Sequence, residues 1–167
     1  MSHIRKKAIS GLAAGDTFSV SRTFRKQDVL QFTEISRDYN PIHFEQRFLS
    51  AKKIDGLICH GLLVASLITE IGGQIGWLAS GMTLQFKKPV YIGDTIRCDF
   101  TITEIDERNR AKGEAVFINE ENIIVLEAVF IGMVPGIQKK QVMRDMLAEG
   151  DPTNEYQDLP ATDVEPS

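Results

Sequence analysis

The sequence has few cysteines, and their placement excludes two classes of protein. Cys59 and Cys98 are its only two cysteines, and both lie within apolar stretches. They do not have the spacing of a zinc site, and two cysteines are too few for a small disulfide-stabilised scaffold. We therefore expect both to be buried free thiols.

Long apolar runs are also missing. No stretch approaches the roughly 20 apolar residues that a membrane-spanning helix needs. The basic residues near the N-terminus are not followed by the apolar segment of a secretory signal. The simplest expectation is a protein that works in the cytoplasm without a membrane partner, although an organelle matrix would fit equally well after processing.

Positive charge is scarce as well. The 19 lysines and arginines are outnumbered by 23 aspartates and glutamates, which gives a formal net charge of -4. A nucleic-acid partner would favour a basic face that neutralises phosphates, and no long run rich in lysine or arginine is present. The sequence thus argues against a nucleic-acid partner, and we expect neither a bound metal nor a cofactor.

What remains is the composition of an ordinary globular protein, with 43% hydrophobic and 25% charged residues in a chain long enough for one domain. We place this domain at residues 14–136, between an N-terminal extension at 1–13 and a C-terminal extension at 137–167. From about Leu147 the chain has acidic residues and prolines but no lysine or arginine, which predicts a disordered acidic tail.

Hydrophobic periodicity predicts an α+β domain in which helices precede most of the sheet. Alternation of apolar and polar residues predicts strands, and apolar residues every three or four positions predict helices. A sheet wrapped around one very apolar helix, buried on most sides, satisfies the order of elements economically. The expected elements are a strand at 18–24, a helix at 27–36, an irregular segment at 37–58, a helix at 61–73 and strands at 82–87, 95–102, 110–118 and 123–134.

The irregular segment carries an acid and an imidazole five residues apart. The turn-forming residues between Asp38 and His43, Asn40-Pro41 among them, can direct both side chains into one pocket. A carboxyl group and an imidazole have reference pKa values of about 3.9 and about 6.5, so one can hold a proton while the other lacks it. Such a pair suits the movement of water, but the same residues also suit a purely structural turn.

The segment Ile58-Cys59-His60-Gly61, at the start of the apolar helix, adds an electrostatic partner. A glycine lets a substrate approach the backbone closely, and an N–H at a helix N-terminus presents partial positive charge. A thioester oxygen needs such a donor when it becomes enolate-like, because negative charge accumulates on it. The alternative is that Gly61 only permits tight packing and that His60 satisfies a local backbone group.

Three segments occur in order along the chain: 36–45 (Ser-Arg-Asp-Tyr-Asn-Pro-Ile-His-Phe-Glu), 58–66 (Ile-Cys-His-Gly-Leu-Leu-Val-Ala-Ser) and 86–94 (Phe-Lys-Lys-Pro-Val-Tyr-Ile-Gly-Asp). Over roughly 14–135 they resemble the MaoC-like dehydratase family, and within it the (R)-specific enoyl-CoA hydratases. The resemblance implies a hotdog fold, with an antiparallel sheet around one central helix, and a homodimer or higher homo-oligomer. It also implies reversible syn hydration of trans-2-enoyl-CoA, or of the acyl-carrier-protein thioester, to the (R)-3-hydroxyacyl thioester.

The resemblance implies roles for individual residues. Asp38 and His43 match the catalytic pair that holds and activates the water. Gly61 matches the glycine whose N–H polarises the thioester carbonyl, and we expect Asn40 to orient the turn that carries the pair.

Three positions differ from the family pattern. Thr69 falls where such hydratases can carry a serine near the site, so we include it as a candidate substrate-binding residue. Arg37 stands where a glycine or an acidic residue is common, and we expect it to face solvent. Glu45 replaces a usual aspartate at a position that we interpret as structural.

Two other functions stay open at this point. A hotdog thioesterase would share the fold and the thioester ligand, with Glu70 as the one carboxylate on the central helix. Another hotdog dehydratase class needs an acid five residues after the glycine, where this chain has Ser66. A catalytically silent acyl-CoA-binding module is the second function that stays open, and Lys87, Lys88 and Arg97 could meet CoA phosphates in any of these proteins.

Overall fold

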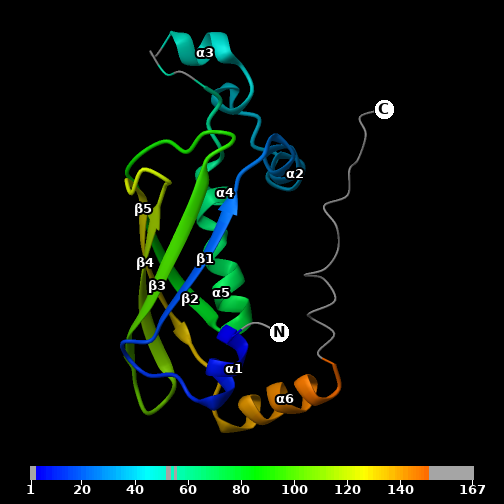
Figure 1. Ribbon diagram of the computed structural model, residues 1–167, viewed down its shortest axis with the longest axis vertical. Helices are drawn as coiled ribbons and strands as arrows, with labels where there is room; N and C mark the ends of the chain where they lie inside the picture. The colour runs from blue at the N-terminus through cyan, green and yellow to red at the C-terminus, as the bar shows by residue number, and fades with distance from the viewer. Residues whose placement is uncertain (1–2, 52–53, 55, 151–167) are drawn as a thin grey trace.

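Five antiparallel strands form one sheet around a central helical segment in the computed structural model, which describes residues 3–51, 54 and 56–150 (Figure 1). The strands lie in the order β1-β3-β4-β5-β2, so β1 and β2 are the two edges. This arrangement confirms the predicted α+β hotdog fold. The elements are α1 (His3–Ser10), β1 (Thr17–Thr23), α2 (Lys26–Ser36), η1 (Pro41–His43), α3 (Gln46–Ser50), α4 (Gly61–Ala65), α5 (Leu67–Ile75), β2 (Leu78–Phe86), β3 (Thr95–Ile105), β4 (Arg110–Ile118), β5 (Ile124–Met133) and α6 (Ile137–Ala148).

The core lies between the central helix and one face of the sheet. Successive side chains of a strand point to opposite faces, so alternation in the sequence assigns one set to the core. On β3 the core-facing set is Ile96, Cys98, Phe100 and Ile102, all of them buried. Phe100 packs edge-on against Phe130 of β5, with ring centroids 6.2 Å apart.

Both cysteines belong to this buried interior. Cys59 and Cys98 are free and buried, as the sequence predicts. Burial raises the pKa of each thiol to about 12, with smaller contributions from nearby carboxylates. Because the thiolate is the reactive form, both cysteines are protected from chemistry at neutral pH.

The central helix differs from the predicted single helix in its continuity. It is interrupted at Ser66, between α4 and α5, where the serine hydroxyl donates to the Leu63 carbonyl at 2.6 Å. Side-chain bonds of this kind compete with regular helical bonding. Ile71 faces the sheet and is fully buried, whereas Leu62 on the other side is 60% exposed. The predicted burial of the helix is confirmed for its other apolar residues, and Leu62 is the exception. The buried residues include Leu63, Ala65, Leu67, Ile68 and Ile71.

The helix also continues two residues beyond the predicted end at Gly73. It ends at Ile75, followed by Gly76 in the left-handed conformation with φ of 78°. A glycine at this position carries no steric penalty, which makes it the usual residue after a helix. None of the described helices is both long and apolar enough to cross a membrane.

Helices from both extensions pack against the domain. In α1, Ile4 and Ala8 are buried in the core, and Arg5 donates from Nε to the Gln74 carbonyl at 2.8 Å, at the end of α5. In α6, Met143 is buried. The predicted boundaries at 13/14 and 136/137 stay a prediction, and the part of the predicted acidic tail at 151–167 lies outside the described residues.

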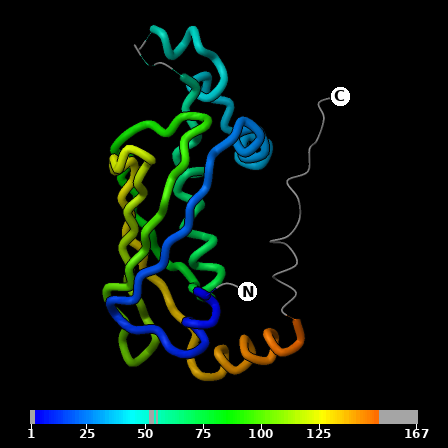
Figure 2. Tube along the Cα trace, viewed as in Figure 1, coloured from blue at the N-terminus to red at the C-terminus, as the bar shows by residue number. Residues whose placement is uncertain are grey.

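The irregular segment projects beyond one end of the sheet, near the start of α4 (Figure 2). It contains the short helices η1 and α3 within the predicted excursion at 37–58. Its last residues are tied to the turn before β3, because Ile58 forms a β-bridge with Tyr91 and the Cys59 N–H donates to the Val90 carbonyl at 2.8 Å. These contacts hold the end of the excursion against the sheet.

Candidate active site

Asp38 and His43 face each other at the start of the irregular segment. Nε2 of His43 lies 3.8 Å from Oδ2 of Asp38. The His43 side chain is 9% exposed and the Asp38 side chain is 48% exposed. His43 is therefore the buried member of the pair, and Asp38 is the member that solvent or a ligand can reach.

Two side-chain turns place the pair. Oδ1 of Asp38 accepts the Asn40 N–H at 3.1 Å, and Oδ1 of Asn40 accepts the Ile42 N–H at 3.2 Å. Aspartate and asparagine form such turns readily, and Pro41 starts the 3-10 turn that ends at His43. Only one carboxylate oxygen of Asp38 is used in this way, which leaves Oδ2 to face His43.

The hydrogen bond on the other side of His43 determines its tautomer. Nδ1 lies 2.7 Å from the Ile58 carbonyl oxygen. A carbonyl can only accept, so Nδ1 carries the proton and Nε2 of the neutral ring is an acceptor. An ionised Asp38 is also only an acceptor. Two acceptors 3.8 Å apart suit a ligand that offers two O–H donors, such as water.

His60 belongs to the same cluster, although it is not among the site residues predicted from the sequence. Its ring is 2% exposed and stacks on His43, with centroids 3.7 Å apart and planes at 27°. Nε2 donates to the Asp38 carbonyl at 3.1 Å, and Nδ1 is buried with no partner among the described residues. The backbone group that His60 satisfies is thus 22 residues away rather than local. In the sequence, the feature that could have indicated a role for His60 in the site was its position next to Gly61.

Burial lowers the pKa of His60. The positive charge that His43 can carry lowers it further, while the bond to the Asp38 carbonyl and the Asp38 charge act in the opposite direction. Burial is the largest of these causes and disfavours the charged form of the ring.

Asp38, His43 and His60 each bring one potential metal ligand atom to within 4.8 Å of the others. Lone pairs of imidazole nitrogens lie in the ring plane, and the two rings are nearly parallel. Their free nitrogens therefore do not converge on one point, as the ligands of a tetrahedral site would. The geometry suits a water-binding pair better than a metal centre.

Gly61 lies beside this cluster at the first residue of α4. It lines, together with His43, a pocket of about 440 Å³ between α4 and the end of β2. A Cβ atom at Gly61 would lie 2.6 Å from Cε1 of Phe86, a distance that real contacts do not reach. A side chain at this position would therefore require the half-exposed Phe86 ring to move. The role of the Gly61 N–H toward a thioester stays a prediction.

Lysines form one rim of the same pocket. Lys87 is paired with Glu127 at 2.8 Å, whereas Lys88 has no ion pair among the described residues. Arg97 is held by Asp99 at 3.0 Å and does not line the pocket. Of the three cations singled out from the sequence, Lys88 is the one placed to meet an anionic ligand.

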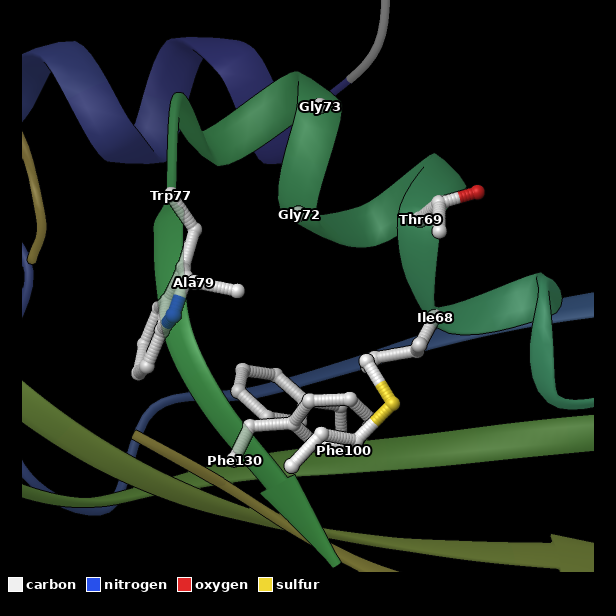
Figure 3. A pocket seen from close by; sticks show the side chains of 9 residues that line it. Ile68, Thr69, Gly72, Gly73, Trp77, Ala79, Phe100 and Phe130 are labelled. Carbon is white, nitrogen blue, oxygen red and sulfur yellow. The ribbon is translucent and has the colours of Figure 1, made fainter. Parts of the chain in front are cut away.

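Thr69 is not brought to the Asp38–His43 pair. It lines a separate pocket of about 150 Å³ between α5 and the sheet, whose walls include Trp77, Phe100 and Phe130 (Figure 3). Its hydroxyl donates to the Ser66 carbonyl at 2.6 Å and points away from both phenylalanines in Figure 3. Apolar surface therefore dominates this pocket, and Thr69 offers it no free hydroxyl donor.

The other positions that differ from the family pattern have local roles. Arg37 ends α2 in the left-handed conformation, with φ of 57°, and is exposed as expected. Glu45 caps α3 by accepting the Arg47 N–H at 3.1 Å and pairs with the Arg47 side chain, whose hydrogen bond lowers the pKa of Glu45 to about 2. This supports the structural interpretation of Glu45.

An antiparallel sheet wrapped around a central helix, with an acid–imidazole pair at the helix start, defines a hotdog-fold protein with a polar site at one end. The model of the protein family described as MaoC like domain matches residues 13–123 of this chain. The chain belongs to the MaoC-like family.

Relatives with named activities share most of this domain. The chain is 32% identical to the (R)-specific enoyl-CoA hydratase of Aeromonas caviae over 100 residues, which cover 58% of this chain and 75% of the relative. It is 30% identical to a mitochondrial 3-hydroxyacyl-acyl-carrier-protein dehydratase of Solanum lycopersicum over 131 residues, covering 75% and 79%. The solved (R)-hydratase of A. caviae superposes with a TM-score of 0.71 at 26% identity, covering 75% of this chain and 98% of that chain.

Proposed function

We propose that this protein catalyses the reversible hydration of a trans-2-enoyl thioester to the (R)-3-hydroxyacyl thioester. The observation that carries the proposal is the pair of facing acceptors, Oδ2 of Asp38 and Nε2 of His43, 3.8 Å apart beside an open pocket. The named relatives act on CoA and on acyl-carrier-protein substrates, which supports this class of reaction for either carrier.

In the proposed mechanism, one water donates a hydrogen bond to each member of the pair. One acceptor removes a proton from the water while the water oxygen forms a bond to C3 of the enoyl group. The C2–C3 π electrons move toward the thioester, and the enolate-like oxygen is stabilised by the Gly61 N–H. The pair then delivers the proton taken from the water to C2 on the same face, which completes the hydration, and the reverse sequence removes water.

The two pockets support a division of the substrate between them. The thioester would lie in the pocket of His43 and Gly61, where Lys88 on the rim can attract the phosphates of either carrier. The apolar pocket at Thr69 would receive acyl carbons. Thr69 and Gly61 lie eight residues apart on nearly continuous helix, a rise of about 12 Å. This spacing supports an acyl chain longer than a butenoyl group.

Hydrolysis of the thioester is less well supported than hydration. A thioesterase of this fold needs a carboxylate aimed at the carbonyl carbon. Glu70 is exposed and lines neither pocket, and the Ser66 hydroxyl is bonded to the Leu63 carbonyl. Neither residue is placed to attack or to activate water at a thioester bound near Gly61.

The test is turnover of trans-2-enoyl-CoA substrates, from crotonyl-CoA to dodecenoyl-CoA, by Asp38→Asn. Asparagine keeps the Oδ1 atom that accepts the Asn40 N–H, so the turn persists while the second acceptor becomes a donor. We expect kcat to fall by at least roughly 10²–10⁴-fold, the scale of general acid–base catalysis. Mass spectrometry of the hydroxyacyl thioester and assay of free thiol separate hydration from hydrolysis.

Asp145→Asn is the matched control, because Asp145 is exposed on α6 at the opposite end of the molecule (Figure 1). It should turn over substrate like the wild type. Wild-type turnover by folded Asp38→Asn would contradict the proposed function, and so would release of CoA thiol as the main product. Absence of turnover by the wild-type protein at every chain length would favour the silent binding module.

A further inference from the structure

His60 connects the three parts of the site that the proposed mechanism uses. It precedes Gly61, bonds to the main chain of Asp38 and stacks on the ring of His43. We propose that His60 is a positioning residue, which holds the Asp38 loop and the His43 ring in register with the start of α4. This inference rests on the proposed hydration and names a residue that acts through the pair.

The first contact restrains the loop of Asp38. This loop follows the end of α2, and its side chains are largely exposed, so few packing contacts hold it. The 3.1 Å bond from Nε2 of His60 to the Asp38 carbonyl attaches it to a residue that is almost fully buried. Thr33 lies 3.5 Å from the same nitrogen, and its hydroxyl donates to the Val29 carbonyl, which leaves it free to accept from His60 as well.

The second contact restrains the ring of His43. Nδ1 of His43 is held by the Ile58 carbonyl, but one hydrogen bond leaves the ring free to tilt about that bond. Stacking at 3.7 Å covers one face of the ring, and Phe44 packs edge-on at 6.2 Å. Nε2 is thereby kept pointed at Asp38, which matters because a misplacement of about 1 Å can cost around 10²-fold in rate.

The charge state of His60 suits this role. The titratable groups that face it are Asp38 and His43, and its other close neighbours, Phe32 and Thr33, are uncharged. Burial disfavours the charged form of His60 and lowers its pKa. The ring therefore suits a role in holding the pair rather than in carrying a proton.

Three substitutions separate the two contacts. His60→Phe keeps a flat ring against His43 and removes the donor to Asp38. His60→Gln keeps an N–H donor and removes the aromatic face, and His60→Leu removes both. We expect His60→Leu to lower kcat roughly 10- to 100-fold with a much smaller change in KM. His60→Phe and His60→Gln should each lower kcat by a smaller factor.

Ile75→Ala is the matched control for damage to the fold. Ile75 is fully buried at the C-terminal end of α5, so its truncation weakens the core without removing a contact of His60. We expect a lower melting temperature and a kcat close to that of the wild type. Loss of stability alone would therefore not reproduce the effect of His60→Leu.

Double variants test whether His60 acts through the pair. In the Asp38→Asn background, His60→Leu should lower kcat little further, because residues that act as a unit are strongly non-additive. Wild-type kcat in folded His60→Leu would overturn the inference, as would an equal loss in both backgrounds. Full activity of Asp38→Asn would instead overturn the proposed hydration, so the two failures are distinguishable.

Discussion

At Gly61 the packing requirement and the proposed chemical role concern different atoms of one residue. A Cβ atom would have to displace the Phe86 ring, whereas the proposed chemistry needs only the N–H. Alanine keeps the N–H and adds the Cβ. Replacing glycine and phenylalanine together can therefore separate the two requirements.

We predict that Gly61→Ala lowers the free energy of unfolding by about 1–3 kcal/mol, the usual cost of overpacking, and also reduces kcat by displacing α4. In the Phe86→Ala background the clash is absent, so adding Gly61→Ala should change the stability and kcat only slightly. Urea denaturation and crotonyl-CoA turnover of the four proteins in this cycle measure both effects. If Gly61→Ala lowered kcat equally with and without Phe86, the added Cβ would be blocking the substrate itself.

A second prediction at the residue scale concerns pH. Burial lowers the pKa of folded His60, while the unfolded chain has the reference value of about 6.5. Near and below that value the unfolded state binds more protons, so the free energy of unfolding falls as the pH drops through it. His60→Phe should reduce this slope, which denaturation at a series of pH values measures. His3→Gln, at an exposed histidine, should leave the slope intact.

At the scale of elements, α5 determines the shape of the apolar pocket. Gly72 lines this pocket, and a Cβ there would meet only Cβ of Trp77 at 3.9 Å, an ordinary contact. A larger side chain can thus enter the pocket without disturbing the helix. Alanine would even favour the helix, since glycine costs up to about 1 kcal/mol in a helix interior.

We predict that Gly72→Leu shifts the substrate preference toward short chains. Removing space for acyl carbons should lower kcat/KM for dodecenoyl-CoA by roughly 10–200-fold, the scale for a methylene in an apolar pocket, with little effect on crotonyl-CoA. The control is Glu70→Leu, which adds a leucine to the exposed side of the same helix. Equal losses for all chain lengths would mean that this pocket does not hold the acyl chain.

At the scale of the whole molecule, the edge strand β2 presents apolar side chains to solvent. Leu78, Met82 and Phe86 are 63%, 50% and 56% exposed. An edge strand with an apolar surface can pair with a second chain, and natural monomers usually protect such edges with charge. Phe86 also contacts Gly61, so pairing at this edge would lie next to the candidate active site.

We predict a homodimer that uses the β2 edge. Met82→Lys should raise the dissociation constant, because it places a charge in the apolar surface, and sedimentation equilibrium measures the change. Ile35→Lys is the control, since Ile35 is 85% exposed on α2 and away from β2. A wild-type protein that stays monomeric over the whole concentration range would refute this prediction.

The sequence by itself determined the features that depend on neighbouring residues. Alternation predicts β4 at 110–118 with the observed bounds, because side-chain direction in a strand repeats every two residues. Asn40-Pro41 predicts the turn that brings Asp38 and His43 together, because both turn bonds lie within five residues. The motif order was specific enough to predict the family.

Only the tertiary structure decided the features that depend on residues distant in the sequence. His60 reaches Asp38 across 22 positions, and Phe86 packs against Gly61 across 25. The exposed face of α5 and the separation of Thr69 from the pair depend on which side of the helix the sheet covers. No local pattern encodes these distances, because they arise when separate elements pack against one another.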